Sequence, residues 1–346
     1  MKIRPKTSMQ DIASHLGVSK NAVSLALNDK PGVSDQLRAQ VFEAANRLNY
    51  RLTKKNNRKR NHLLVLIPSY IKNDRIFYYE LFWAIEQRTK ENGYHAVIHG
   101  VTPEMEENLI MPDMNTEMSI HGILIVGVLR VEFVRKLLDS GLPLVTVDHC
   151  YESLQLDAVV TANEDESYKM VKHLIDHGHR EIGFIGSVEM TRSFKERWAG
   201  YTNAMQDANL EINRHHCLLQ SSPLSVLLSS KDELTTFIDG LQSMPTAWFC
   251  ANDAIAITMI QILQVRGIKV PDDISIAGFD DIAAAAMIVP TLTTIQVQRE
   301  QLGFEAVDFL IRKIEYGGAP AKISIYGELI VRSSCSPRKA VVAKQD

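Results

Sequence analysis

The sequence predicts an all-α helix-turn-helix headpiece followed by an α/β core of two doubly wound parallel-sheet subdomains. Two observations predict this organisation. Short helical patterns with turn residues between them fill the chain before Tyr50, and apolar runs of strand length alternate with helix-length segments after His62. The 346 residues are enough for two or three compact units.

The headpiece has three helical patterns with their start and stop signals. The first has Ser8 as its N-cap and ends at Gly17, where a tight turn needs a positive φ. Ser19 caps the second and Ser34 caps the third. Two short helices joined by a Gly turn and braced by a third form a helix-turn-helix. The residues expected in its core are Met9, Ile12, Ala13, Leu16, Val23, Ala26, Leu27, Leu37, Val41, Ala44, Ala45 and Leu48.

The second helix has an outer face that suits the major groove of DNA. Leu25 lies on that face or at its edge and can press on thymine methyl groups, while Lys20 and Asn21 can bond to base edges. A plain three-helix bundle with one exposed leucine is the alternative. The residues expected to contact DNA are Ser8, Ser19, Lys20, Asn21, Ser24, Leu25, Asn28, Ser34, Tyr50, Lys54, Lys55 and Arg58.

The charge distribution supports a nucleic-acid partner for the headpiece. Residues 1–60 hold 13 Lys or Arg and 4 Asp or Glu, a net charge of +9. Since the whole chain carries −3, the remaining residues carry −12. A basic head on an acidic body favours DNA binding by the head and another task for the body, although a solvated basic arm without a partner would have the same charge.

The headpiece closely resembles that of the lactose-repressor (LacI/GalR) family. The similarity lies in Ala13, Gly17, the run VSKNAVSLALND from Val18 to Asp29, and the closing LNY that ends at Tyr50. It implies a DNA-binding headpiece over residues 1–52.

The linker at residues 53–62 departs from the pattern of that family. It is basic and has no apolar residue after Leu52, whereas the resemblance implies a short hinge helix with a leucine wedged into the minor groove. A basic segment can track phosphates instead. For the free protein, a disordered tether is the alternative.

The body alternates between apolar strands and helices, which is typical of parallel sheets buried on both faces. Two such sets predict two subdomains. The expected strands are 63–67, 95–100, 122–127, 143–148 and 157–162 in the first set, and 181–186, 217–220, 247–252 and 275–280 in the second.

The body also resembles the type I periplasmic-binding-protein-like core of the same family. The similar phrases are LIDHGHREIGFIGS (174–187), ERWAGY (196–201), PTAWFCANDAIA (245–256), GIKVPDDISIAGFDD (267–281) and PTLTTI (290–295). The resemblance implies an N-subdomain of residues 63–161 with 292–321 and a C-subdomain of residues 162–291 with 322–340. The three crossovers would fall near 161–163, 290–293 and 320–324.

A small polar effector, expected to be a sugar, would lie in the cleft between these subdomains. Arg197, Asn252 and Asp280 match family positions that bind such an effector, and their side chains supply a donor fork, an amide and a carboxylate. Relatives often place an aromatic residue near positions 221–223, where this chain has none. Either the effector is larger or less ring-like than a single hexose, or Trp198 stacks on it instead. The other expected effector contacts are Ser69, Phe77, Tyr78, Asp148 and Gln298.

These resemblances imply a sequence-specific transcriptional repressor that binds a palindromic operator as a homodimer. Its operator affinity would respond to the effector. A solute-binding protein of a transport system is the alternative, since it would share the core, but it has no use for a basic helical head. The tail has no leucine heptads, so a coiled-coil tetramer is not expected.

Neither a cofactor, nor a metal site, nor a catalytic residue is expected. The nucleotide motifs G-x-G-x-x-G and G-x-x-x-x-G-K-[ST] are absent, and no nucleophile–base pair occurs at motif spacing. His173 and His177 are four residues apart but have no further ligands beside them, except His179. With scattered cysteines, no long apolar run and no apolar signal core, the chain is expected to be cytoplasmic, without a membrane partner and not an enzyme.

Overall fold

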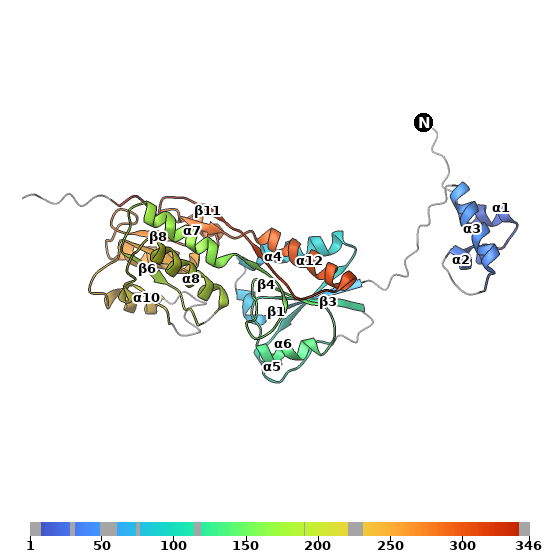
Figure 1. Cartoon of the computed structure of the whole chain (residues 1–346), viewed down its shortest axis with the longest axis horizontal. Coiled ribbons are helices and arrows are strands. Elements are labelled where there is room, and N and C mark those ends of the chain that lie inside the picture. Colours follow the sequence, from blue (N-terminus) through green and yellow to red (C-terminus); the bar gives the residue numbers. More distant parts are fainter. Residues whose placement is uncertain are drawn as a thin grey trace, which may run out of the picture. The chain divides into compact units, whose positions relative to one another are not determined.

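A computed structural model describes residues 8–27, 32–48, 61–73, 77–113, 119–189, 191–220 and 231–338 (Figure 1). It divides into two compact units, Met1–Lys59 and Arg60–Asp346. Among the described residues, no helix is both long and apolar enough to cross a lipid bilayer.

The smaller unit contains the three predicted helices, α1 (Met9–Leu16), α2 (Lys20–Leu27) and α3 (Asp35–Arg47). Ser8 and Asp11 form a capping box at the start of α1, and Gly17 ends this helix with a φ of 67°. The buried core consists of apolar residues from all three helices, at the predicted positions Ile12, Ala13, Val23, Ala26, Leu27, Val41, Ala44 and Ala45.

The larger unit contains two lobes (Figure 1). The first is built on one sheet of six strands in the order β10-β5-β4-β3-β1-β2, and all neighbouring pairs are parallel. The strands are β1 (Asn61–Pro68), β2 (His95–Val101), β3 (Ser119–Val126), β4 (Leu144–Val147), β5 (Asp157–Thr161) and β10 (Lys322–Ile325).

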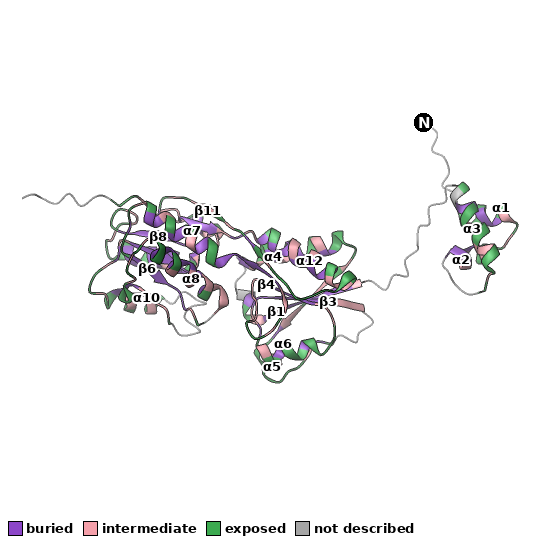
Figure 2. Cartoon of the chain, viewed as in Figure 1, coloured by how far each residue is buried: buried purple, intermediate pink, exposed green. Residues whose placement is uncertain are grey.

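Helices cover both faces of this sheet, as its continuous apolar strands predicted. Leu63 and Val65 of β1 pack in the cluster that includes α4 (Phe77–Glu91) and α12 (Arg299–Tyr316). The alternate residues Leu64 and Leu66 pack with α6 (Val131–Leu138), beside α5 (Pro103–Glu107). The strands are therefore largely buried and the outer faces of the helices are exposed (Figure 2). A 3-10 helix, η1 (Ser69–Asn73), follows β1.

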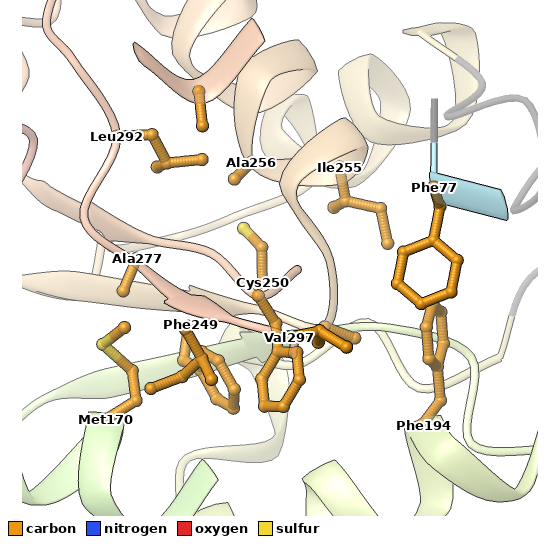
Figure 3. Packing of buried hydrophobic residues seen from close by; sticks show 14 of the residues in the cluster. Phe77, Met170, Phe194, Phe249, Cys250, Ile255, Ala256, Ala277, Leu292 and Val297 are labelled. Carbon is orange, nitrogen blue, oxygen red and sulfur yellow. The ribbon is translucent and has the colours of Figure 1, made fainter. Parts of the chain in front are cut away.

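The second lobe contains a parallel sheet in the order β6-β7-β8 and an antiparallel pair β11-β9. Its strands are β6 (Ile182–Ile185), β7 (Ala247–Cys250), β8 (Ser275–Ala277), β9 (Thr294–Gln296) and β11 (Glu328–Ile330). Its helices are α7 (Asn163–Asp176), α8 (Arg192–Asp207), α10 (Lys231–Asp239) and α11 (Asp253–Val265), with 3-10 turns η2 (Arg214–His216) and η3 (Ala283–Ala286). Figure 3 shows part of the apolar cluster in which its core residues pack, together with Phe77 of the first lobe.

Helices α7 and α8 approach each other closely because α8 has a glycine at the contact. A Cβ atom built on Gly200 would lie 2.2 Å from the backbone oxygen of Glu164 and 2.8 Å from the Cβ of Ser167. No side chain larger than hydrogen fits at this position unless the two helices separate.

Several predicted boundaries differ from the structure. His62 is buried in β1, so the first strand begins inside the predicted linker of residues 53–62. Residues 322–325 were predicted in the C-subdomain, but they form β10, which pairs with β5 in the first sheet. Residues 294–296 were predicted in the N-subdomain, but they form β9, which pairs with β11 and bridges to Asp280. Strand partners decide these boundaries, and local sequence patterns do not reveal them.

Candidate functional site

The headpiece presents the N-terminus of α2 with polar side chains around it. The hydroxyl oxygen of Ser19 accepts a hydrogen bond from the backbone N–H of Ala22 at 3.1 Å, which caps the helix. Lys20 and Asn21 follow directly and are exposed. A helix N-terminus with exposed donors suits the phosphates and base edges of duplex DNA.

The other two predicted serines also cap helices. Ser34 accepts from the N–H of Leu37 at 3.2 Å. The Ser8 hydroxyl accepts from the N–H of Asp11 at 3.4 Å and donates to its carboxylate at 2.8 Å. Ser19 and Ser34 can therefore still donate to a phosphate, whereas the proton of Ser8 is already used within the headpiece.

Leu25 is half-buried, as is Ser24. A Cβ built on Gly32 would lie 3.4 Å from Cδ1 of Leu25, so the leucine packs close to Gly32. Part of it remains available to a partner. The remaining residues expected to contact DNA lie outside the described residues: Asn28, Tyr50, Lys54, Lys55 and Arg58.

Arg197 is the centre of the candidate effector site in the larger unit. It lies on α8 and is only 4% exposed. Its guanidinium donates to Asn163 Oδ1 at 2.9 Å and to the backbone oxygen of Ala251 at 2.6 Å, and it pairs with Asp280 Oδ1 at 3.2 Å. The guanidinium also lies 3.7 Å from the centroid of the Phe279 ring. The charge of Arg197 is thus compensated, as a buried charge requires.

The loop that carries Asp280 is held in an unusual backbone conformation. Asp280 has a φ of 114° and Asp281 has a φ of 52°, values that residues other than Gly adopt at a cost. The side chain of Asp253 braces this loop, because it accepts from the N–H of Ile282 at 2.9 Å and from the hydroxyl of Thr294 at 2.5 Å. Burial, with the nearby charge of Asp280, raises the pKa of Asp253 well above its ordinary value.

Asn252 lies beside these residues, because it follows Ala251 and caps α11. Its Oδ1 accepts from the N–H of Ile255 at 2.9 Å, so the cap fixes one side of the amide. The structure therefore brings Arg197, Asp280 and Asn252 together, as the sequence predicted for an effector site. That these residues bind an effector stays a prediction.

Arg299 joins this cluster to the first lobe. It is the first residue of α12 and is 8% exposed. It donates to Glu80 of α4 at 2.7 Å and to the backbone oxygens of Asp280 and Asp281 at 2.6 and 3.2 Å. Its guanidinium also lies 5.6 Å from the centroid of the Phe77 ring. In Figure 3, Phe77 of the first lobe and Phe194 of the second point toward one another.

Sequence reasoning missed Arg299 and Asn163. Asn163 is buried at the start of α7, where its amide nitrogen donates to Glu196 at 3.1 Å while its oxygen accepts from Arg197. Both residues open a helix at a passage between the lobes, β9 to α12 and β5 to α7. A polar residue at the start of such a helix is the signal that could have revealed them.

A second group of charges connects the lobes near α8. Glu152, after β4, pairs with Lys195 at 3.0 Å and with Arg192 at 3.4 Å. Arg192 also pairs with Glu196 at 2.8 Å. Burial, together with the charge of Arg192, lowers the pKa of His149 to about 4.

The other expected effector contacts lie at the edge of the first lobe. Ser69 follows β1, and Asp148, with a φ of 63°, follows β4, so both stand at the carboxyl end of the same parallel sheet. The Tyr78 ring stacks against Phe82 at a centroid distance of 6.2 Å. Gln298 precedes α12 and donates to Gln296 at 3.4 Å.

The side chain of Trp198 does not lie beside that of Arg197, where it was expected to stack on the effector. Its ring lies 5.0 Å from that of Tyr201 and 5.2 Å from that of Phe184, and the Arg214 guanidinium lies 4.9 Å from its centroid. Successive residues of a helix point about 100° apart. Trp198 therefore packs on a different side of α8 from Arg197 and does not join the Asp280 cluster.

Comparisons with known proteins agree with the division of the chain into a headpiece and a core. Residues 8–52 match the family model for bacterial regulatory proteins of the lacI family, and residues 171–335 match that for a periplasmic binding protein-like domain. The chain is 30% identical over 344 residues to the HTH-type transcriptional regulator DegA of Bacillus subtilis (strain 168), covering 96% of this chain and 99% of the relative. The chain belongs to the lacI family.

Other relatives in the lacI family span the chain equally fully. The HTH-type transcriptional repressor PurR of Vibrio campbellii is 29% identical over 336 residues, which cover 94% of this chain and 98% of the relative. Two solved structures share the fold: a lac repressor dimer bound to operator and an anti-inducer (TM-score 0.70, 20% identity) and a CelR–cellobiose complex (TM-score 0.69, 23% identity). Each covers 96% of this chain, which covers 100% of it. The chain is thus a DNA-binding transcriptional regulator and not an enzyme, as predicted.

Proposed function

We propose that the chain is a cytoplasmic repressor that binds a palindromic operator as a homodimer and responds to a neutral, hydroxyl-rich effector, a sugar. The effector would bind at Arg197, Asn252 and Asp280. The observation that carries this proposal is the compact cluster of a donor fork, an amide and a carboxylate beside the Arg299 connection to the first lobe.

The charges of the cluster favour a neutral effector. Arg197 pairs with Asp280, Arg299 with Glu80, and Arg192 with Glu196 and Glu152. An anionic ligand would have to compete with these carboxylates for each of these three arginines. A sugar hydroxyl can donate to a carboxylate and accept from a guanidinium without separating the charges.

The relatives support a repressor with such an effector. PurR of Vibrio campbellii is named a repressor, and structures similar to this one include complexes with cellobiose and with ribose. A solute-binding protein would share the periplasmic binding protein-like domain alone. The match of residues 8–52 to the lacI family favours a regulator over that alternative.

The contacts of Arg299 suggest how an effector acts on the first lobe. A ligand held by Asp280 would change the loop whose carbonyl oxygens bind Arg299, and Arg299 also holds Glu80 on α4. If the two lobe arrangements differ in effector affinity, binding shifts their populations and with them the spacing of paired headpieces.

Thermal unfolding in a panel of neutral sugars, purine bases and sugar phosphates tests the proposal, followed by operator affinity with each stabilising compound. We expect a neutral sugar to raise the Tm and change operator affinity. Asp280→Asn should abolish both effects. Asp308→Asn, which removes an aspartate paired with Arg88 in the first lobe, should preserve them.

Two results would contradict the effector assignment. Stabilisation by purine bases or by sugar phosphates alone would show that the effector belongs to another class. An undiminished sugar response in Asp280→Asn would show that the sugar binds elsewhere. Neither result would affect the assignment of DNA binding to the headpiece.

A further inference from the structure

A cavity of about 430 Å³ lies on the second lobe, away from the Arg197 cluster. It is formed by η2 with the residue on either side of it, the C-terminal part of α10 and the segment after α10. This volume is within the range of small-molecule sites, roughly 300–1,000 Å³. Its apolar wall includes Phe237 and Leu241.

Among the described residues that line the cavity, the polar side chains include an arginine and two histidines, and none is a carboxylate. Asn213, Arg214, His215, His216, Gln242 and Ser243 contribute to this lining. A cavity lining without carboxylates is unexpected here, because the chain outside residues 1–60 has a net charge of −12. A wall of guanidinium, imidazole, amide and hydroxyl groups attracts an anion.

Arg214 differs from the arginines near Asp280 in lacking a carboxylate partner. Its guanidinium lies 4.9 Å from the centroid of the Trp198 ring, and no ion pair joins it to any Asp or Glu that the structure describes. It is also exposed, so its side chain can reach a ligand. Arg214 therefore has its charge and most of its donors available for a carboxylate or a phosphate.

His216 lines the cavity, and one of its two ring nitrogens has no partner among the described residues. The residue is 3% exposed, and its Nε2 lies 3.3 Å from the hydroxyl of Ser243. Its Nδ1 is buried and has no hydrogen-bond partner among the described residues. The backbone oxygen of His216 accepts from Nε1 of Trp248 at 3.0 Å, which fixes the position of the residue. A buried polar nitrogen without a partner is rare in native proteins.

We propose that this cavity is a second ligand site, which binds a small anion bearing a carboxylate or phosphate group through Arg214. The site is separate from the candidate effector site, because Trp198, which contacts Arg214, lies on a different side of α8 from Arg197. The neutral sugar proposed for the Arg197 cluster and the anion proposed here are chemically distinct ligands.

Two of the three tryptophans of the chain report on this cavity. Trp198 is covered by Arg214, and Trp248 donates to the backbone of His216. The third, Trp83, lies exposed on α4 of the first lobe. The full-length Trp83→Phe variant would therefore confine the fluorescence signal to the surroundings of the cavity.

Fluorescence titration of that variant with inorganic phosphate and with citrate, at constant ionic strength set by NaCl, tests the proposal. Glucose serves as the neutral probe. We expect at least one of the two anions to change the tryptophan fluorescence in a saturable way. We expect no binding of glucose at this cavity. Tighter binding of phosphate would indicate a ligand with a phosphate group, and tighter binding of citrate a ligand with a carboxylate group.

Arg214→Gln should weaken anion binding about tenfold or more, the usual effect of losing a charge-assisted hydrogen bond. The control Arg135→Gln removes an exposed arginine of α6 and should leave the affinity unchanged. Far-UV circular dichroism of both variants would establish that they fold.

The absence of a saturable change with both anions would overturn the proposal. So would equal anion affinity in Arg214→Gln and its parent. Anion binding that survives Arg214→Gln but disappears in Arg197→Gln would place the anion in the candidate effector site instead.

Discussion

Arg197 shows how the larger unit keeps a charge buried. Its guanidinium has an amide, a backbone carbonyl and a carboxylate as partners, and an aromatic ring lies against its face. Loss of one member of a buried charged pair costs about 3–5 kcal/mol, because the other charge stays buried without a partner. A ligand at this site must therefore bond to the pair without breaking it.

His149 makes the stability of the larger unit depend on pH, which can be tested. Its folded-state pKa of about 4 is lower than its ordinary 6.5, so the folded protein binds fewer protons than the unfolded chain between these values. Its contribution to stability is full above pH 6.5 and is lost as the pH falls toward 4. His149→Gln should remove this loss.

Urea unfolding at pH 7 and pH 4.5 measures the effect. Between these two values, the free energy of unfolding should fall by about 2 kcal/mol less in His149→Gln than in the parent chain. Equal losses in both proteins would show that His149 titrates normally.

The residue types of the site could be predicted from sequence, but not all of their contacts. That Arg197, Asn252 and Asp280 lie together could be predicted because the phrases around them resemble those of the family. Arg299 was missed because its role depends on Glu80, more than two hundred positions away. The packing of Trp198 on another side of α8 from Arg197 was not predicted, although one step along a helix turns a side chain by about 100°.

The pairing of helices α7 and α8 positions both Asn163 and Arg197. The backbone contact at Gly200 sets the distance between the two helices. Gly200→Ala would force a Cβ to within 2.2 Å of the Glu164 carbonyl oxygen, which the helices can relieve only by separating.

We expect Gly200→Ala to destabilise the larger unit by about 3 kcal/mol, despite the better helix propensity of alanine. Gly240→Ala is the matched control, because its Cβ would meet its nearest atoms at 3.5 and 3.6 Å, an ordinary contact. Thermal unfolding of the two variants gives the comparison. A loss in the control as large as that in Gly200→Ala would refute the steric explanation.

Most elements were predictable because their signals are local. The three headpiece helices have caps, a Gly turn and apolar spacing in the sequence, and the strands of the parallel sheets are continuous apolar runs. The predicted strand at 217–220 contributes only an isolated bridge from Leu218 to Ile185. Strands β10 and β11 are short and half-exposed, and their sheets are decided by distant partners.

At the scale of the whole molecule, a lacI-family headpiece is combined with a core whose two lobes meet at a buried polar cluster. The charge difference between head and body is a property of the entire sequence and by itself predicts this division. The two units have separate cores, so variants of one can be tested while the other stays folded.

The central claim is that α2 of the headpiece reads DNA sequence. The most direct measurement is the affinity of the full chain, at physiological salt, for a duplex that it selects from a random pool, compared with a duplex of random sequence. We expect a selected palindrome bound about a thousandfold more tightly or better. Lys20→Ala should weaken binding to the palindrome more than to the random duplex, because Lys20 follows the cap of α2 and is exposed at its N-terminus. If the chain selected no sequence, or if Lys20→Ala weakened both duplexes equally, the claim would be contradicted.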